Sequence, residues 1–319
     1  MNMSQVKLKN QEVLLNFKQE LKEKKEPHTI LFISSDSLLS SRMMETFTQA
    51  ILCEDLCDDC LNCKKLLSHN HPDVMYFPTK NQLLVEDSNK ITNESFVRPI
   101  FADKKIFIIS NFDKSTEEAQ NKLLKIFEEP MENVYYLLST TNIEKILPTI
   151  RSRCFKISLP KLSKEEIEGE IIASCDRELV LELGKGNLGK TLELSRQKDL
   201  DEVFGLVKSI FKEMKNSKQV VVFANKILSK KDNFDLIIEM MYIILEDTLA
   251  KICKKEELIT LKTQMNFLND IVNDYTVKSV CEIEKLLRKL QEERTFNVNL
   301  PAIVDNLLLG ILEVKYLCK

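Results

Sequence analysis

The first half of the chain alternates short apolar runs with amphipathic segments. The runs are rich in β-branched and aromatic residues and predict five strands, at Thr29–Ile33, Val74–Phe77, Ile106–Ile109, Tyr135–Ser139 and Phe155–Ile157. Between them, apolar residues recur at helical spacing over segments that include Met43–Leu52 and Glu117–Phe127. The second helix is expected to end before Pro130, because proline cannot continue a helix. Strands that alternate with helices predict a parallel sheet with helices on both faces.

The strand pattern stops after Pro160. Ser163 is followed three residues later by Glu166, a capping box that predicts the start of a helix. Three glycines within Gly184–Gly189 predict a turn between two further helices. We therefore expect a small helical domain over residues 161–199.

From Leu200 onward apolar residues recur at helical spacing almost throughout, as in Phe234, Ile237, Ile238, Met241, Ile244 and Leu245. This pattern predicts an all-helical domain over residues 200–319, which is a normal domain size. The expected fold class is thus α/β, with a parallel-sheet domain over residues 1–160 followed by two helical domains.

Glycine content changes what this sheet domain can bind. The chain has six glycines in 319 residues, and none precedes Gly169. Average usage would place roughly 22 in a chain of this length. A conventional phosphate-binding loop needs glycine because its backbone approaches the phosphate without a Cβ in the way. The first half of the chain therefore excludes an ordinary Walker A loop or dinucleotide fingerprint.

The segment after the first strand nevertheless has the order of a phosphate-binding loop: a strand, an eight-residue loop over 34–41, and then a helix. Ser34 and Leu39 stand at the glycine positions, and Ser40 replaces the lysine that would hold the β- and γ-phosphates. Ser41 stands at the position of the hydroxyl residue. We expect this degenerate loop to bind no ATP.

The third strand is followed by Ser110 and Asn111, where a Walker B strand would end in two carboxylates. Neither a Mg²⁺ ligand nor a base that orients water is available at these two positions. Asp113 comes three residues late, and we expect it to cap the helix that begins near Thr116.

The overall charge is close to neutral, at −3 with a pI near 5.9. Capture of nucleic acid by the whole surface is therefore not expected, and any DNA contact must be local or shared with partners. No run of 18 apolar residues occurs, and the first 27 residues are charged and amphipathic, unlike a signal peptide. We expect a cytoplasmic protein with no membrane partner.

Four of the nine cysteines, Cys53, Cys57, Cys60 and Cys63, form a cluster. Four converging thiolates supply a tetrahedral zinc site, and the Cys-x2-Cys spacing presents two of them on one turn, so structural zinc is the favoured interpretation of residues 53–63. An iron–sulfur cluster is an alternative, although the order of the gaps differs from the ferredoxin pattern. A third is a metal-free stripe along one helix, since the spacing is also helical.

The three histidines leave further alternatives open. His69 or His71 could replace one cysteine in a Cys₃His site, although such histidines more often pack or cap a turn. With four protein ligands a zinc ion has no open position, so hydrolytic zinc is not indicated. Cysteine-protease chemistry is not supported, because no pairing of a thiol with His28, His69 or His71 is indicated.

Two arginines lie in the segment Leu147–Cys154, just before the last predicted strand. A guanidinium at a subunit boundary can stabilise the charge that develops on a phosphate bound by a neighbouring subunit. From local sequence alone, a solvated arginine or a local ion pair is the favoured interpretation of Arg153.

Together these features resemble the delta-prime subunits of bacterial DNA polymerase III clamp loaders, a family within the AAA+ superfamily. The resemblance runs from about His28 to Leu194. It rests on the cysteine cluster and on four motifs, His71-Pro-Asp73, Asn121–Pro130, Ser139–Asn142 and Leu147–Cys154. The family's first zinc cysteine usually lies further upstream, so the resemblance supports Cys57, Cys60 and Cys63 more directly than Cys53.

The resemblance implies an AAA+ domain, a small helical lid domain and a C-terminal collar that mediates oligomerisation. It implies a subunit that does not hydrolyse ATP and assembles with a delta subunit and three gamma/tau ATPases to load the sliding clamp on primed DNA. Arg153, in the Ser-Arg-Cys motif, would act in trans as an arginine finger. Two alternatives remain, an active gamma/tau-type ATPase and a zinc-containing DNA-binding or regulatory module.

Overall fold

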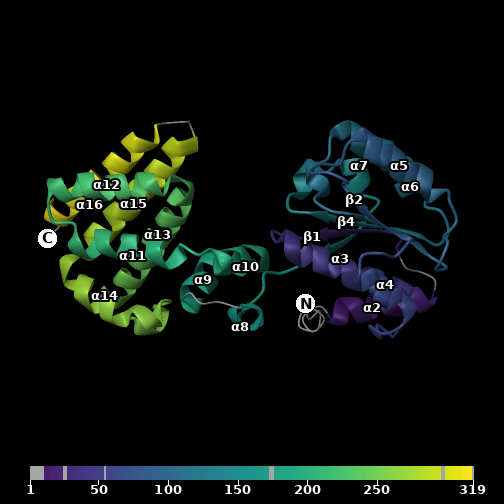
Figure 1. Ribbon diagram of the computed structural model, residues 1–319, viewed down its shortest axis with the longest axis horizontal. Helices are drawn as coiled ribbons and strands as arrows, with labels where there is room; N and C mark the ends of the chain where they lie inside the picture. The colour runs from purple at the N-terminus through teal and green to yellow at the C-terminus, as the bar shows by residue number, and fades with distance from the viewer. Residues whose placement is uncertain (1–10, 24–26, 54, 172–175, 296–298, 318–319) are drawn as a thin grey trace. The chain divides into compact units, whose positions relative to one another are not determined.

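The computed structural model describes residues 11–23, 27–53, 55–171, 176–295 and 299–317 (Figure 1). The chain divides into two compact units. The first contains the residues up to Glu166 together with Asn187–Lys190. The second contains Ile167–Gly186 and the chain from Thr191 onward. The three-domain division predicted from the sequence stays a prediction.

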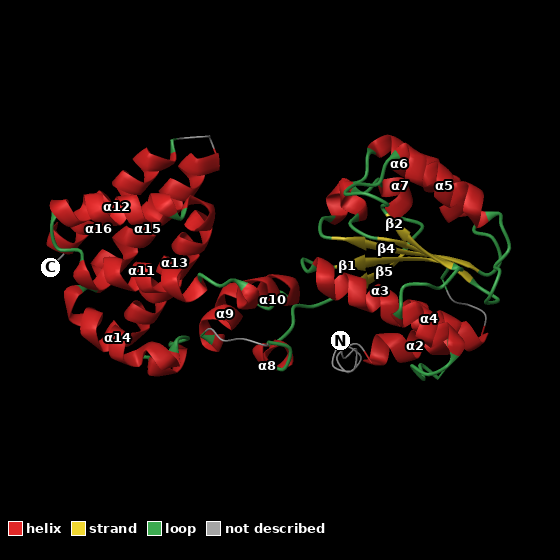
Figure 2. Cartoon of the chain, in the orientation of Figure 1, coloured by secondary structure: helices red, strands yellow, loops and turns green. Residues whose placement is uncertain are grey.

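A five-stranded parallel sheet forms the centre of the first unit (Figure 2). Its strands are β1 (Thr29–Ile33), β2 (Val74–Phe77), β3 (Lys105–Ile109), β4 (Val134–Thr140) and β5 (Phe155–Ser158). Their order across the sheet is β2-β3-β4-β1-β5. All five predicted strands are confirmed. β1 lies inside the sheet, where Ile30 pairs with Leu137 of β4 and Phe155 of β5.

The helices of the first unit cover both faces of this sheet, with α5, α6 and α7 on one face and α3 on the other (Figure 2). They are α2 (Gln11–Glu23), α3 (Ser37–Leu52), α4 (Leu61–Leu67), α5 (Val85–Ser95), α6 (Glu117–Glu128) and α7 (Pro148–Arg151), with short 3-10 helices at Phe112–Lys114 and Ile143–Lys145. Helix α8 (Lys164–Glu168) follows β5. The amide of Ser163 donates to Glu166 at 2.7 Å, which is one half of the predicted capping box.

The start of α3 differs from the sequence prediction. The helix begins at Ser37, six residues before the predicted Met43. Asp36 caps it by accepting hydrogen bonds from the amides of Leu38 and Leu39. The connection between β1 and α3 is therefore Ser34–Asp36, shorter than the eight-residue loop that we expected.

Among the described residues, the second unit is helical. Its helices are α9 (Arg177–Gly184), α10 (Leu188–Arg196, whose first turn belongs to the first unit), α11 (Leu200–Glu213), α12 (Ser217–Ser229), α13 (Phe234–Ile252), α14 (Met265–Ile271), α15 (Val277–Thr295) and α16 (Leu300–Leu317). Short 3-10 helices lie at Lys231–Asn233, Glu256–Leu258, Lys262–Gln264 and Val272–Asp274. The apolar stripe predicted over 234–245 lies on α13 and is buried. None of the described helices combines the length and apolar character needed to cross a membrane.

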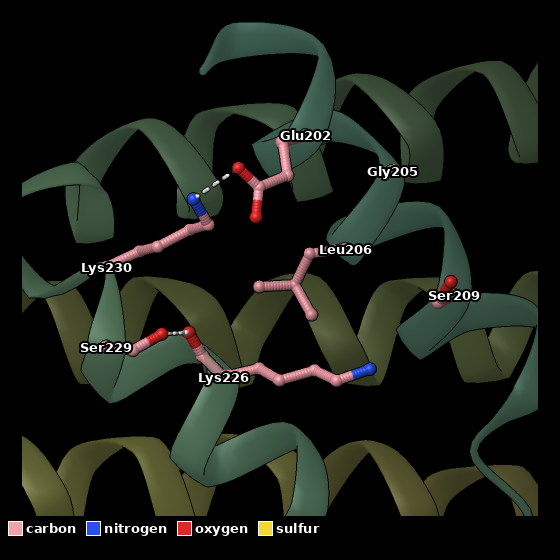
Figure 3. Close-up of a pocket in the computed structure, with 7 residues that line it drawn as sticks. All are labelled: Glu202, Gly205, Leu206, Ser209, Lys226, Ser229 and Lys230. Atoms are coloured by element: carbon pink, nitrogen blue, oxygen red, sulfur yellow. Dashed lines mark hydrogen bonds and ion pairs between the residues drawn. The ribbon is translucent and has the colours of Figure 1, made fainter.

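A pocket of about 250 Å³ opens between α11 and α12 (Figure 3). Lys230 and Glu202 form an ion pair of 3.0 Å at one end of it. Gly205 lies on its wall, and a Cβ built there would meet nothing within 4 Å. This glycine therefore adds flexibility to α11 without making room for a neighbour.

We expect Gly205→Ala to raise the free energy of unfolding by about 0.5–1 kcal/mol, because alanine lowers the entropy lost in ordering a helix. Denaturant unfolding of the whole chain would measure the change. Gly184→Ala is the matched control: a Cβ there would lie 3.4 Å from the Thr191 backbone and overlap its side chain, so this variant should lose stability. Destabilisation by Gly205→Ala would show that the pocket wall is packed in solution.

Candidate functional site

The four clustered cysteines converge in the structure. Cys53 follows the last residue of α3, Cys57 lies in the next turn, Cys60 caps α4, and Cys63 lies inside α4. Their sulfur atoms all lie within 4.8 Å of one another, and those of Cys53 and Cys57 are 3.7 Å apart. Sulfurs around a tetrahedral zinc ion are roughly 3.8 Å apart, given a Zn–S distance of about 2.3 Å. The residues present thus fit a tetrahedral four-sulfur metal site.

The metal-free helical stripe is wrong as an account of these cysteines. Helix α3 ends at Leu52 and α4 begins at Leu61, so the four residues do not share one helix. Leu56 and Asp58 adopt positive φ angles of 50° and 58° between them. These two turns fold the chain back and bring the Cys53 and Cys57 sulfurs to Cys60 and Cys63.

Hydrogen-bond donors surround the sulfurs. The amide of Cys60 donates to Cys57 Sγ at 3.3 Å, and the amide of Cys63 donates to Cys60 Sγ at 3.4 Å. The side-chain amide of Gln49, on α3, donates to Cys63 Sγ at 3.3 Å. Such donors favour the thiolate form that binds a metal.

Two thiols of this cluster, Cys57 and Cys63, differ in acidity. Hydrogen bonds from the backbone amides of Asp59 and Cys60 lower the pKa of Cys57 to about 7. Burial raises the pKa of Cys63 to about 12. A bound cation would favour the thiolate at both residues, because a coordinating thiol gives up its proton.

The histidines after the cluster have other partners. His71 is buried; its Nδ1 accepts from the amide of Asp73 at 3.2 Å and its Nε2 lies 3.3 Å from Asn62 Oδ1. Both ring nitrogens of His71 are therefore engaged within the protein. His69 packs edge-on against Tyr76 and lies 4.0 Å from Glu45. In the described chain, the group of potential metal ligands around these sulfurs comprises the four cysteines.

The residues that replace a phosphate-binding loop lie at the end of β1 and in the first turns of α3. Leu39 and Ser40 are fully covered inside α3, and Ser34 is buried at the end of β1. Ser40 Oγ finds no hydrogen-bond partner within the described residues. Ser41 Oγ bonds back to the Ser37 carbonyl at 2.9 Å. The hydroxyl that replaces the lysine is thus buried, and that of its neighbour Ser41 is turned back onto the helix backbone.

Asp36, which was not predicted as a site residue, is the N-cap of α3. It is 3% exposed, and its carboxylate accepts hydrogen bonds from the amides of α3 and from those of Leu188 and Gly189. The Asp36-Ser-Leu stretch ahead of an apolar helix was a recognisable N-cap signal.

The prediction that Asp113 caps α6 is wrong. Thr116 is the cap, since its hydroxyl accepts from the Ala119 amide at 3.2 Å. Asp113 instead accepts from the amide and the hydroxyl of Thr141, at 3.3 and 2.9 Å. Asn111, in the left-handed region, donates its amide to Ser139 Oγ at 3.0 Å. The Asp113 carboxylate therefore links the segment after β3 to the segment after β4.

Arg153 lies between α7 and β5 and is one-third exposed. Its guanidinium forms an ion pair of 2.5 Å with Glu128, the last residue of α6, and donates to the Thr149 carbonyl at 2.6 Å. Arg151 pairs separately with Glu144 at 3.0 Å. The structure thus brings together the Glu-Glu-Pro end of one sequence motif and the Ser-Arg-Cys end of another.

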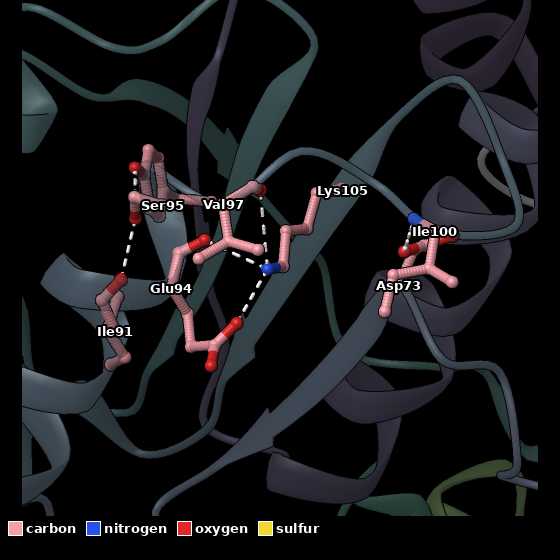
Figure 4. Close-up of polar contacts among 8 residues, drawn as sticks. Asp73, Ile91, Glu94, Ser95, Val97, Ile100 and Lys105 are labelled. Atoms are coloured by element: carbon pink, nitrogen blue, oxygen red, sulfur yellow. Dashed lines mark hydrogen bonds and ion pairs between the residues drawn. The ribbon is translucent and has the colours of Figure 1, made fainter.

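A second buried carboxylate explains the His71-Pro-Asp73 motif (Figure 4). Asp73 accepts from the consecutive amides of Ile100, Phe101 and Ala102, at 2.6, 2.7 and 2.7 Å. Lys105, 5% exposed in its side chain, pairs with Glu94 at 2.7 Å on the other side of the same loop. These contacts fix the 96–104 connection to the sheet, so the motif has a structural role.

The N-terminal half of the chain is similar to a known protein family. Residues 9–163 match the family model described as "DNA polymerase III, delta subunit". The five-stranded parallel sheet and the helices that follow it confirm the expected α/β fold class with further helical segments.

The particular relatives are delta-prime subunits of DNA polymerase III, which confirms the resemblance drawn from the sequence. The chain is 24% identical over 266 residues to the delta-prime subunit of Bacillus subtilis, covering 81% of each protein. It is 35% identical over 152 residues to that of Buchnera aphidicola subsp. Schizaphis graminum, covering 45% of this chain and 46% of that one. A gamma subunit-related structure from Thermotoga maritima aligns over 95% of this chain and 99% of its own at 20% identity, with a TM-score of 0.45.

Proposed function

We propose that the chain is a non-hydrolysing subunit of a DNA polymerase III clamp loader, of the delta-prime type. The observation that carries this proposal is the junction of β1 and α3, where a buried carboxylate, Asp36, caps the helix and Ser40, inside α3, replaces the lysine. A carboxylate at this position repels a nucleotide phosphate, and Ser40 offers no positive charge in compensation. ATP would then be bound and hydrolysed by neighbouring subunits.

In this proposal Arg153 is the residue that acts on the neighbour's ATP. A guanidinium presents five donors in a planar fork that matches phosphate oxygens. Its position between α7 and β5 leaves it one-third exposed, and its intramolecular partner Glu128 is itself 44% exposed. An exposed ion pair of this kind is worth about 1 kcal/mol or less, so a γ-phosphate can compete for the arginine.

The remaining parts follow the same proposal. Structural zinc would be held by Cys53, Cys57, Cys60 and Cys63, and would fix the connection between α3 and α4. The AAA+ domain would comprise residues 1–160, the lid 161–199 and the collar 200–319, with the collar holding delta and gamma/tau partners. Sliding clamp and primed DNA would be met through the assembled complex, in the cytoplasm.

Similarity to the tau/gamma subunit of Haemophilus influenzae, 28% identical over 152 residues, makes an active ATPase the alternative function. The serines and leucine of the loop and the Ser110-Asn111 pair disfavour it. A separate zinc-containing DNA-binding module is disfavoured by the pI near 5.9, since such modules carry clustered positive charge.

Co-purification with the delta and gamma/tau subunits of the same organism tests the proposal. We expect one defined complex on size-exclusion chromatography, and no saturable ATP binding by the isolated chain in equilibrium dialysis. A chain that binds ATP at micromolar concentration would support the active ATPase instead. Failure to co-assemble would overturn the clamp-loader assignment.

A further inference from the structure

The carboxylate of Asp36 contacts the first turns of two helices. Its Oδ1 accepts from the amides of Leu38 and Leu39, at 3.0 and 3.1 Å, in the first turn of α3. Its Oδ2 accepts from the amides of Leu188 and Gly189, at 2.5 and 3.4 Å, in the first turn of α10. The two pairs come from positions 152 residues apart in sequence but belong to the same compact unit.

This arrangement has the form of an anion site. Backbone amides at a helix N-terminus carry partial positive charge and bind phosphate or carboxylate groups. A simple helix cap uses one side-chain oxygen and leaves the other to solvent. Here both oxygens are used, the group is 3% exposed, and the second oxygen serves a helix that an N-cap would not reach.

The residues around the Asp36 carboxylate also hold the loop and the 187–190 segment together. A Cβ on Gly189 would lie 3.3 Å from Asp36 Oδ1 and 3.4 Å from Leu38 Cβ, so a side chain there would crowd the carboxylate. Asn187 donates from its side chain to the Ser35 carbonyl at 3.0 Å and accepts from the Lys190 amide at 2.8 Å. Ser34 Oγ accepts from the Asp36 amide at 3.0 Å. The loop and the 187–190 segment are thus joined at several points around one negative charge.

We propose that the Asp36 carboxylate is a built-in substitute for a nucleotide phosphate. It fills the anion position where α3 begins and binds the 187–190 segment there without any ligand. The start of α3 and the 187–190 segment therefore stay joined at all times, as they would be if both bound the same phosphate. The negative charge of Asp36 also repels a phosphate from this position. This inference rests on the proposed function, because a built-in phosphate substitute is useful only in a subunit that binds no nucleotide.

Asp36→Asn separates the two halves of the contact. Asparagine is a good helix cap, so its oxygen continues to accept from Leu38 and Leu39. Its amide nitrogen replaces one oxygen and cannot accept from Leu188 and Gly189. Hydrogen exchange of the isolated full chain should show protection at Leu38 and Leu39 close to wild type, and on the order of tenfold faster exchange at Leu188 and Gly189. Unchanged exchange at Leu188 and Gly189 would overturn the proposal.

Asp36→Ala removes both halves and opens the position to an external anion. The melting temperature should fall by at least the roughly 2–4 °C that one lost cap costs a domain of this size. Inorganic phosphate should raise it again in Asp36→Ala but leave the wild type unaffected. Asp176→Ala is the control. Asp176 caps α9 through Glu178 and Leu179, but its second oxygen accepts from the side chains of Thr263 and Gln264 and not from the amides of a second helix, so phosphate should not restore this variant. Equal stabilisation of all three proteins by phosphate, or no stabilisation of Asp36→Ala, would refute the proposal that the carboxylate replaces a phosphate.

These measurements need no partner subunit. Failure of the exchange and phosphate tests would leave co-assembly with delta and gamma/tau as a separate question. Failure to co-assemble would likewise leave the carboxylate contact as it stands. The two proposals can therefore be decided independently.

Discussion

Arg153→Ala is expected to leave the reconstituted complex assembled while ATP hydrolysis at the site it faces falls by about 10³-fold or more. In the proposed role the guanidinium would stabilise the charge that develops on the γ-phosphate in the transition state, whereas assembly would depend on the collar domain. Single-turnover hydrolysis in a complex loaded with ATP would show the loss as the disappearance of one site's share of the hydrolysed ATP. Clamp loading on primed DNA should decline with it.

The chain offers two matched controls for this experiment. Arg151 lies two residues away and pairs with Glu144 at 3.0 Å, so Arg151→Ala removes the same charge from the same segment. It should change the rate little. Glu128→Gln removes the intramolecular partner of Arg153 without removing the arginine, and should keep or raise the rate. Unchanged hydrolysis in Arg153→Ala, or an equal loss in Arg151→Ala, would contradict the finger role.

Most strands of the sheet could be predicted because they are short apolar runs bounded by polar or turn residues; β5, which contains Lys156 and is mostly exposed, is the exception. Ile106–Ile109 is an example: it is buried on both faces, and its sequence contains no polar residue. The parallel arrangement followed from the helical patterns between the runs. Burial on both faces leaves few alternatives, so local sequence sufficed for this part of the fold.

The polar connections could not be predicted in the same way. Asp36 and Asp113 are both acidic residues that closely follow a strand, and local sequence offers each a nearby helix to cap. Asp36 caps its helix and also reaches Leu188, whereas Asp113 turns to Thr141. The deciding partners lie 152 and 28 residues away along the chain. Such choices depend on the folded sheet, which no local pattern contains.

Cysteine spacing predicted that the four sulfurs would converge, but not how. The helical interpretation of the same spacing failed because Leu56 and Asp58 adopt positive φ angles, a conformation that neither residue type favours strongly. The donor from Gln49 to Cys63 was also hidden, since it lies one helix earlier. A shared metal, if bound by the four thiols as proposed, would offset the strain of these two residues.

The second large effect is expected at these cysteines. Zinc analysis of the purified chain should find about one ion per molecule, and Cys60→Ser should lose it. Cys60 both supplies a sulfur and caps α4, accepting from the Cys63 amide. Serine retains an oxygen that can cap the helix, so Cys60→Ser removes the ligand while keeping the helix end capped. The affinity for zinc should fall by more than the roughly 10–100-fold that loss of an outer hydrogen-bond partner costs a metal site.

The pH dependence of zinc binding is a second test of the same site. Zinc must displace the proton of Cys63, whose pKa burial raises to about 12, whereas Cys57 at about 7 is already partly ionised at neutral pH. Binding therefore releases protons, and zinc affinity should weaken as the pH is lowered. Competition with a coloured zinc chelator over a pH series would measure it.

Cys253→Ser is the control for both measurements, because Cys253 is an exposed thiol in the second unit and far along the chain from the cluster. It should retain the ion and the pH dependence of the wild type. A visible iron–sulfur absorption in the protein as isolated would show that the cysteines hold an iron–sulfur cluster and not zinc. Full zinc content in Cys60→Ser would mean that the four sulfurs do not act together, and the turn between α3 and α4 would then need another source of stability.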